Sequence, residues 1–226
     1  MTALRYPPRR SSFYQPEIEV PRPVIGLDID GTLGRYHEHF IQFAVDWLGI
    51  WAPPMEYDGS VSLATFLGIS KARYRKVKLA YRQGGLKRSM PIYSGAKDIS
   101  RVTRKAGAEV VICTTRPFLQ LEAVDPDTKE WLKRNGIQYD NLIHGENKYR
   151  ELAKRYPGRV VGIVEDLPEL IAQAETLGLR PIIRAQAYNR GYVSANEGTD
   201  RFDSLGVIAE VLLERIRQYE LDKGMR

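Results

Sequence analysis

Short apolar segments that alternate with longer amphipathic segments constrain the fold of this chain more than any other feature. The apolar runs predict strands at Val24–Leu27, 109–113, about 139–143, 160–164 and 181–183. The amphipathic stretches predict helices at about 94–106, 127–135, 147–155, 168–177 and 203–221. Strands that alternate with helices of this length are joined by right-handed crossovers. The sequence therefore predicts an α/β fold, a doubly wound parallel sheet with helices on both faces.

The segment between the first two predicted strands has a different pattern. It contains two aromatic-rich helical stretches, at about 37–48 and 71–82, which are separated by the breaker-rich residues 51–54. We expect this segment to form a small helical cap. The first residues hold many prolines and no apolar period, which predicts an extended or disordered arm. We expect an N-terminal arm at 1–23 and a catalytic core formed by 24–34 together with 93–226. The cap, at 35–92, is inserted between the two parts of the core.

The composition is that of an ordinary globular protein. The chain has 226 residues, of which 43% are hydrophobic and 27% are charged. No apolar run approaches the roughly 18 residues that a membrane span needs. The first residues carry charges and prolines where a signal peptide needs an apolar core. A single cysteine, Cys113, excludes an internal disulfide and fits a reducing compartment. We therefore expect a cytoplasmic protein without a membrane partner.

The formal net charge of +6 favours polyanions as partners. Lysine and arginine are spread along the sequence and are not gathered in one stripe. A basic solvated surface is therefore the preferred interpretation, and nucleic acid stays open as a partner without being favoured. The sequence does not decide the oligomeric state, and a homodimer stays open.

Two carboxylates follow the first predicted strand, in the segment Asp28-Ile29-Asp30-Gly31-Thr32. Residues two apart on a strand share a face, so both side chains can point to one site. Neighbouring carboxylates repel each other unless a divalent cation lies between them or one is protonated. One of them could attack phosphorus while the other protonates the leaving oxygen. The pair therefore indicates covalent phosphoryl chemistry.

Three further segments bring polar groups to the same edge of the predicted sheet. Thr114-Thr115-Arg116 follows the second strand, and its hydroxyl and guanidinium groups can bind phosphoryl oxygens. Lys148 comes after the third strand, where an ammonium group can neutralise the nucleophile and the transferring phosphoryl group. Glu165-Asp166 follows the fourth strand, where a further carboxylate can complete an oxygen shell for magnesium.

These four segments resemble, in order and spacing, the four motifs of the haloacid dehalogenase superfamily of phosphatases. The resemblance extends over roughly residues 24–215, and the insertion at 35–92 is similar to the helical cap of that superfamily. A narrower similarity is to the cytosolic and phage-type 5'-deoxynucleotidases. It depends on the compact aromatic cap, the return at 92–96 and the Leu-Pro-Glu that follows Glu165-Asp166.

The resemblance implies a role for each residue. Asp28 would form an aspartyl-phosphate, and Asp30 would act first as the acid and then as the base. The phosphoryl group would be held by Thr114 and Lys148. Thr115 and Arg116 are candidate substrate contacts because of their own hydroxyl and guanidinium groups, and capping of the next helix or contact with solvent stays open for them. Magnesium would be bound by the Asp28 side chain, the Asp30 backbone carbonyl and Asp166, with Glu165 in support. Many relatives have Asp-Asp where this chain has Glu165-Asp166, so the last two roles can be reversed.

The expected function is a magnesium-dependent phosphohydrolase for a small phosphorylated substrate, first of all a deoxynucleoside 5'-monophosphate. A cap that closes over the site favours small substrates over polymers. The runner-up is a polynucleotide 3'-phosphatase. Residues 128–132 and 139–142 of this chain resemble in part the sequence of such phosphatases. Transfer of the phosphoryl group to an acceptor other than water stays open. A non-catalytic nucleic-acid-binding protein is the alternative from another class, and the paired acids argue against it because they repel phosphates.

Overall fold

A six-stranded sheet lies at the centre of the computed structural model, which describes residues 21–51, 53–117, 121–196 and 199–224. All its strand pairs are parallel, and the strand order is β3-β2-β1-β4-β5-β6. The strands are β1 (Val24–Leu27), β2 (Glu109–Thr114), β3 (Asn141–His144), β4 (Val160–Glu165), β5 (Pro181–Arg184) and β6 (Arg201–Phe202). This topology confirms the predicted doubly wound parallel sheet.

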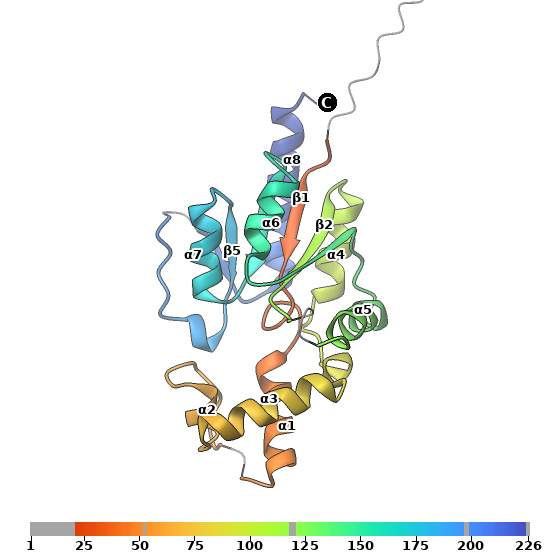
Figure 1. Cartoon of the computed structure of the whole chain (residues 1–226). Coiled ribbons are helices and arrows are strands. Elements are labelled where there is room, and N and C mark those ends of the chain that lie inside the picture. The colour runs from red at the N-terminus through yellow and green to blue at the C-terminus, as the bar shows by residue number, and fades with distance from the viewer. Residues whose placement is uncertain (1–20, 52, 118–120, 197–198, 225–226) are drawn as a thin grey trace, which may run out of the picture.

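Helices cover both faces of the sheet, as Figure 1 shows. Their bounds are α4 (Ala96–Lys105), α5 (Val124–Arg134), α6 (Lys148–Arg155), α7 (Pro168–Thr176) and α8 (Leu205–Asp222). Side chains that alternate along β2 enter different cores, because successive residues of a strand point to opposite faces. Val110 and Ile112 pack in the core with α4, α5 and α8, whereas Val111 and Cys113 pack in the core with α6 and α7.

The segment between β1 and α4 forms helices with a hydrophobic cluster of their own. These helices are α1 (Tyr36–Leu48), α2 (Leu63–Phe66), α3 (Lys71–Gln83) and the short 3-10 helix η1 (Leu86–Ser89). Phe40, Val77 and Tyr81 are buried in this cluster. The chain leaves and re-enters the core side by side, since Gly34 is bridged to Ile92. In Figure 1 the helices lie beyond the end toward which the β1 and β2 arrows point.

The boundaries differ from the sequence expectations in a few places. The helix expected at 127–135 begins three residues earlier, since α5 starts at Val124 with Pro126 in its first turn, where a missing N–H costs no hydrogen bond. The two-residue strand β6 and the 3-10 helix η2 (Ala187–Asn189) lie in the stretch expected to be a loop. Both are too short to leave a periodic signal. The N-terminal arm lies outside the described residues, except for 21–23.

No helix within the described ranges has the length and apolar character needed to cross a membrane.

Candidate active site

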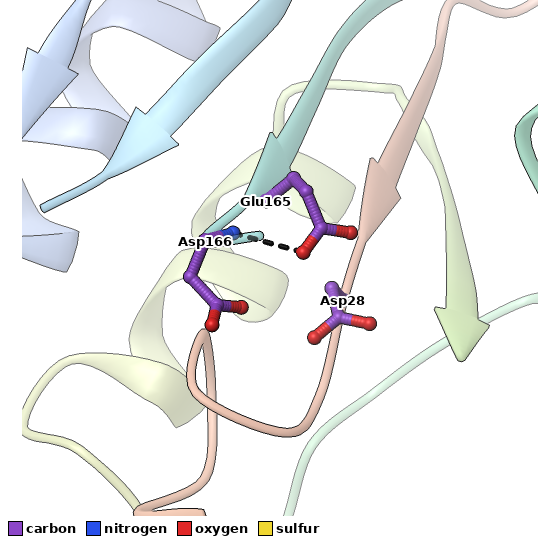
Figure 2. A group of neighbouring side chains, drawn as sticks. All are labelled: Asp28, Glu165 and Asp166. Carbon is purple, nitrogen blue, oxygen red and sulfur yellow. Dashed lines mark hydrogen bonds between the residues drawn. The ribbon is translucent and has the colours of Figure 1, made fainter. Parts of the chain in front are cut away.

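The strand ends of β1 and β4 form the centre of the site. These strands are neighbours in the sheet, but the chain continues from β1 toward β2 on one side and from β4 toward β5 on the other. Ligands of parallel α/β sheets bind at such a switch in strand order, beyond the carboxyl ends of the strands. Asp28 directly follows β1, Glu165 ends β4 and Asp166 follows it. Figure 2 shows the carboxyl groups of these three residues converging from the two strand ends.

The three acids form a buried cluster. One carboxylate oxygen from each residue lies within 4.8 Å of the others. Burial, followed by the negative charge of Glu165, raises the pKa of Asp28 to about 7, and the Lys148 ammonium only partly offsets this rise. Burial and the charges of Glu165 and Asp28 raise the pKa of Asp166 well above its ordinary value. Three carboxylates this close therefore favour a cation among them.

Lys148 supplies one such cation. Its Nζ lies 2.5 Å from Asp28 Oδ1 and 2.6 Å from Glu165 Oε2, and it donates to the Cys113 carbonyl at 3.2 Å. Burial would lower the pKa of Lys148, but the two carboxylates outweigh burial and raise that pKa above its ordinary value. Lys148 is the first residue of α6, so the β3–α6 connection places a charged ammonium directly beside Asp28.

Glu165 is held by the protein itself. Its Oε1 accepts hydrogen bonds from the backbone N–H groups of Asp166 and Leu167, at 2.9 and 3.0 Å. Its Oε2 accepts from the Tyr149 hydroxyl at 2.6 Å and also pairs with Lys148. Both carboxylate oxygens of Glu165 thus already have partners, which are the backbone of the β4–α7 turn, Tyr149 and Lys148.

Asp166 is held by two hydroxyl groups and by close contact with a glycine. Thr32 Oγ1 donates to Asp166 Oδ1 at 2.8 Å, and Tyr188 Oη donates to Oδ2 at 2.5 Å. Gly31 lies against this carboxylate with a φ of +101°, a conformation that L side chains rarely adopt. Hydroxyl donors leave further lone pairs of the Asp166 carboxylate available to a metal ion.

The donor set fits a hard divalent cation. Asp28 and Asp166 offer carboxylate oxygens from two adjacent strand ends, and Mg²⁺ prefers oxygen ligands. Glu165 is the third acid of the cluster, but its oxygens are already used by Lys148, Tyr149 and two backbone N–H groups. The hydrogen bonding therefore favours Asp166 over Glu165 as a metal ligand.

Asp30 lies beside this cluster and is paired with two cations. Arg116 donates to both Asp30 oxygens, at 2.6 and 3.2 Å, and Lys87 pairs with Oδ2. Burial would raise the pKa of Asp30, but Arg116 and Lys87 outweigh burial and hold that pKa well below its usual range. The pairing with Arg116 and Lys87 therefore favours the ionised form of Asp30, which suits a base better than an acid.

Thr114, Thr115 and Arg116 follow one another at the end of β2, but they differ in orientation. Thr114 is buried, and its Oγ1 accepts from the Arg116 backbone N–H at 3.3 Å. Thr115 lines the cavity in front of Asp28 and Asp30. Arg116 binds Asp30 and also donates to the Thr128 hydroxyl at 3.0 Å. Its guanidinium is therefore already paired with Asp30 and would contact a substrate only in addition to that pairing.

A cavity of about 220 Å³ lies between the strand ends and the helices α1 to α3. Its core wall includes Asp28, Asp30, Thr115 and Arg116. The opposite wall is formed by residues of the inserted helices, namely Tyr36, His37, Leu63, Tyr74, Lys78, Arg82 and Lys87. Burial lowers the pKa of Lys87 to about 7, although its partner Asp30 counteracts this shift.

Sequence reasoning missed Lys87 and Tyr188 as site residues. Lys87 is one of several basic residues in the inserted segment, and nothing in the sequence distinguishes the one that reaches Asp30. Tyr188 lies in the 3-10 helix η2, which sequence reasoning treated as a loop. Only the folded chain brings these two residues to the acids of β1 and β4.

Comparison with known sequences gives a distant relative but no family. No known family model matches the chain. A protein of Chlorobaculum tepidum that carries the provisional name 5'(3')-deoxyribonucleotidase is 27% identical over 170 residues, which cover 74% of this chain and 81% of that protein.

Solved structures assign the fold. A haloacid dehalogenase-like hydrolase of Streptococcus pneumoniae matches with a TM-score of 0.59 and 15% identity, over 84% of this chain and 98% of that one. The D,D-heptose 1,7-bisphosphate phosphatase of B. bronchiseptica, solved with magnesium and phosphate, matches with a TM-score of 0.53 and 17% identity, over 85% and 98%. The chain therefore has the fold of haloacid dehalogenase-like hydrolases, as its sequence resemblance predicted.

Proposed function

We propose that this protein is a magnesium-dependent phosphohydrolase that acts on deoxynucleoside 5'-monophosphates through an aspartyl-phosphate. The observation that carries this proposal is the constellation of Asp28, Lys148 and Asp166 at the switch in strand order. The resemblance to the 27% identical Chlorobaculum tepidum protein supports a nucleotide as the substrate. The inserted helices, which we interpret as a cap, support a small substrate because they close one side of the cavity.

Asp28 is the proposed nucleophile. Its Oδ1 is held by Lys148, so the other carboxylate oxygen can attack phosphorus. The bond from phosphorus to the ester oxygen then breaks, and the nucleoside leaves. Lys148 remains charged and offsets the negative charge of the phosphoryl group as it is transferred. Water then attacks the aspartyl-phosphate, which releases inorganic phosphate and restores Asp28.

Asp30 is the proposed proton carrier for both halves of the reaction. In the first half it gives a proton to the leaving oxygen, and in the second it takes one from the attacking water. Its pairing with Arg116 and Lys87 opposes the first of these steps, because it stabilises the ionised carboxylate. An anionic ester in the cavity competes for these two cations. We therefore assign to substrate binding the role of loosening them from Asp30, which then takes up from solvent the proton that it gives to the leaving oxygen.

Asp28, the Asp30 backbone carbonyl and Asp166 are the proposed ligands of magnesium, and Glu165 supports them. Bound there, magnesium supplies positive charge that polarises the phosphoryl group. Thr32, Tyr188 and Glu165 keep the acids in place around it. Thr114 and Thr115 are the proposed hydroxyl contacts of the phosphoryl oxygens at the end of β2.

A phosphate-release assay tests the proposal. The purified protein is given deoxynucleoside 5'-monophosphates, sugar phosphates and oligonucleotide 3'-phosphates, each with magnesium and with a chelator. Among these three classes of ester we expect the highest kcat/KM for a deoxynucleoside 5'-monophosphate. We also expect activity to be lost in chelator and restored by magnesium.

Asp28→Asn is the matched variant for this assay. It keeps the size of the side chain but removes the attacking oxygen, so hydrolysis should fall by several orders of magnitude. More than a tenth of wild-type turnover in this variant would disprove the nucleophile assignment. Faster hydrolysis of oligonucleotide 3'-phosphates would replace the nucleotidase with a polynucleotide 3'-phosphatase, and no release from any ester would favour the non-catalytic binding protein.

A further inference from the structure

Helix α3 carries basic residues and no acidic residue, and the structure arranges four of the basic ones in a row. The basic residues of α3 are Lys71, Arg73, Arg75, Lys76, Lys78 and Arg82. Lys71, Arg75, Lys78 and Arg82 follow one another at intervals of four, three and four residues, a spacing that gathers side chains on one side of a helix. We name these four residues the α3 cation row. The spread of lysine and arginine along the sequence does not reveal this row, and the absence of a basic stripe expected from the sequence is therefore corrected for α3.

The cation row runs from the candidate active site toward solvent. Lys78 and Arg82 line the cavity that also contains Asp28 and Asp30. Lys71, Arg75 and Lys78 line an adjoining cavity of about 510 Å³. The two cavities share Leu63, Tyr74 and Lys78 as lining residues, so they are neighbours along α3. A molecule bound at Asp28 can therefore reach the row at Lys78 and Arg82, which line the same cavity.

The four cations have no carboxylate partner among the described residues. The other two cations of the active-site cavity, Lys87 and Arg116, both pair with Asp30. Burial lowers the pKa of Lys78, and the neighbouring Arg82 lowers it further, while only Asp30 acts in the opposite direction. Lys78 and Arg82 are half-buried, whereas Lys71 and Arg75 are exposed. The two half-buried and unpaired charges favour an anion from outside the protein.

The transferred phosphoryl group has other partners. Lys148 reaches Asp28 from α6, on the core side of the site, whereas the cation row belongs to the inserted helices on the opposite side of the cavity. Along a helix with a 1.5 Å rise, Lys78 and Arg82 are about 6 Å apart, and the whole row spans about 16 Å. The row thus lies on the side of the cavity opposite to the Asp28–Lys148 pair.

We propose that the α3 cation row binds a second phosphate group of the substrate, so that a nucleotide with two phosphates is preferred over a monophosphate. This inference depends on the proposed phosphohydrolase function, whose substrate it specifies further. The second phosphate can be the 3'-phosphate of a nucleoside bisphosphate or the phosphodiester of a short oligonucleotide. Both offer the same anionic oxygens to Lys78 and Arg82.

A binding titration tests the inference without depending on turnover. Asp28→Asn protein with magnesium is titrated with three probes, namely deoxythymidine 5'-monophosphate, deoxythymidine 3',5'-bisphosphate and a 5'-phosphorylated tetranucleotide. We expect the bisphosphate to bind about tenfold to a hundredfold more tightly than the monophosphate, since a charge-assisted hydrogen bond contributes a factor of this order. Equal affinity for these two nucleotides overturns the inference.

Variants of α3 assign the effect to the row. Lys78→Met with Arg82→Met removes two charges from the row and keeps apolar stems in place. Arg73→Met with Lys76→Met is the matched control, because it removes the same charge from the same helix, on a face that lines a different cavity. The first pair should abolish the preference for the bisphosphate, and the control pair should keep it. An equal loss in both double variants would show a general charge effect and overturn the inference.

The tetranucleotide identifies the source of the second phosphate. Tighter binding of the tetranucleotide than of the bisphosphate, lost in Lys71→Met with Arg75→Met, would assign the row to a polymer. No gain beyond the bisphosphate would assign it to a small nucleotide. If the wild-type protein releases phosphate from none of these probes, the proposed hydrolase fails, while the titration still decides whether the row binds a second phosphate.

Discussion

Gly31 lies so close to Asp166 that a Cβ at position 31 would be 2.2 Å from Asp166 Oδ2 and 2.5 Å from the Tyr188 hydroxyl. The turn after β1, which carries Asp28 and Asp30, therefore packs directly on the third acid of the site. A side chain at this position would push apart the groups that we propose to bind magnesium. The glycine of the first motif is thus a packing requirement as well as a conformational one.

Gly31→Ala should weaken magnesium binding and destabilise the fold. The positive φ alone costs about 1–2 kcal/mol for alanine, and the contact with Asp166 adds to that cost. Gly107→Ala is the matched control, because Gly107 has a φ of +92° and an added Cβ there would meet its nearest atom, Glu220 Oε1, at 3.7 Å. Thermal unfolding should show lower stability in both variants. Magnesium titration should show lower magnesium affinity only in Gly31→Ala. Unchanged magnesium affinity in that variant would contradict the proposed site.

Asp166→Asn and Glu165→Gln should have opposite consequences. Asp166→Asn removes a carboxylate that its acidic neighbours repel, so stability without metal should hold or rise while the magnesium needed for half-maximal activity increases at least about tenfold. Glu165→Gln loses its ion pair with Lys148, so it should lower stability more than it changes the magnesium requirement. Denaturant unfolding and magnesium titration of both variants give the ranking. The reverse ranking would make Glu165 the ligand.

Lys148→Met should destabilise the protein by about 3–5 kcal/mol, because it leaves the buried carboxylates of Asp28 and Glu165 without their ammonium partner. Magnesium should restore part of this loss, since a cation that binds only the folded state stabilises it. Denaturant unfolding with and without magnesium measures both effects. Lys154→Met, at an exposed position of the same helix, should change neither. A Lys148 variant as stable as the wild type would show that the acids do not depend on this lysine.

His37 should make the stability depend on pH below neutrality. Burial lowers the pKa of His37 to about 4, and the ring packs against Tyr188 and Tyr57. Between pH 6.5 and 4 the unfolded chain binds a proton that the folded chain does not, so stability falls as the pH falls and changes no further below 4. Between pH 7 and 5 this amounts to about 1–2 kcal/mol. Urea unfolding of His37→Phe should lack this part of the dependence, and an identical slope in both proteins would contradict it.

The alternation of apolar strands with helices was enough to predict the parallel sheet and the edge at which its acids meet. Side chains alternate along a strand, and parallel strands have their carboxyl ends at one edge of the sheet. Once the strand order is set, Asp28, Lys148 and Asp166 therefore necessarily lie near each other. The comparisons confirm the fold. The catalytic and metal-binding roles of these residues stay predictions.

The partners of these acids were decided by the tertiary structure alone. Lys87 reaches Asp30 because the inserted helices dock over the strand ends, and Tyr188 reaches Asp166 from a 3-10 helix after β5. The distribution of basic residues along the sequence hid the α3 cation row, since only the orientation of α3 against the core decides which side faces the cavity. The local sequence pattern determines whether a segment forms a helix or a strand and which of its residues share a face. The surroundings of each face depend on packing between segments far apart in the chain.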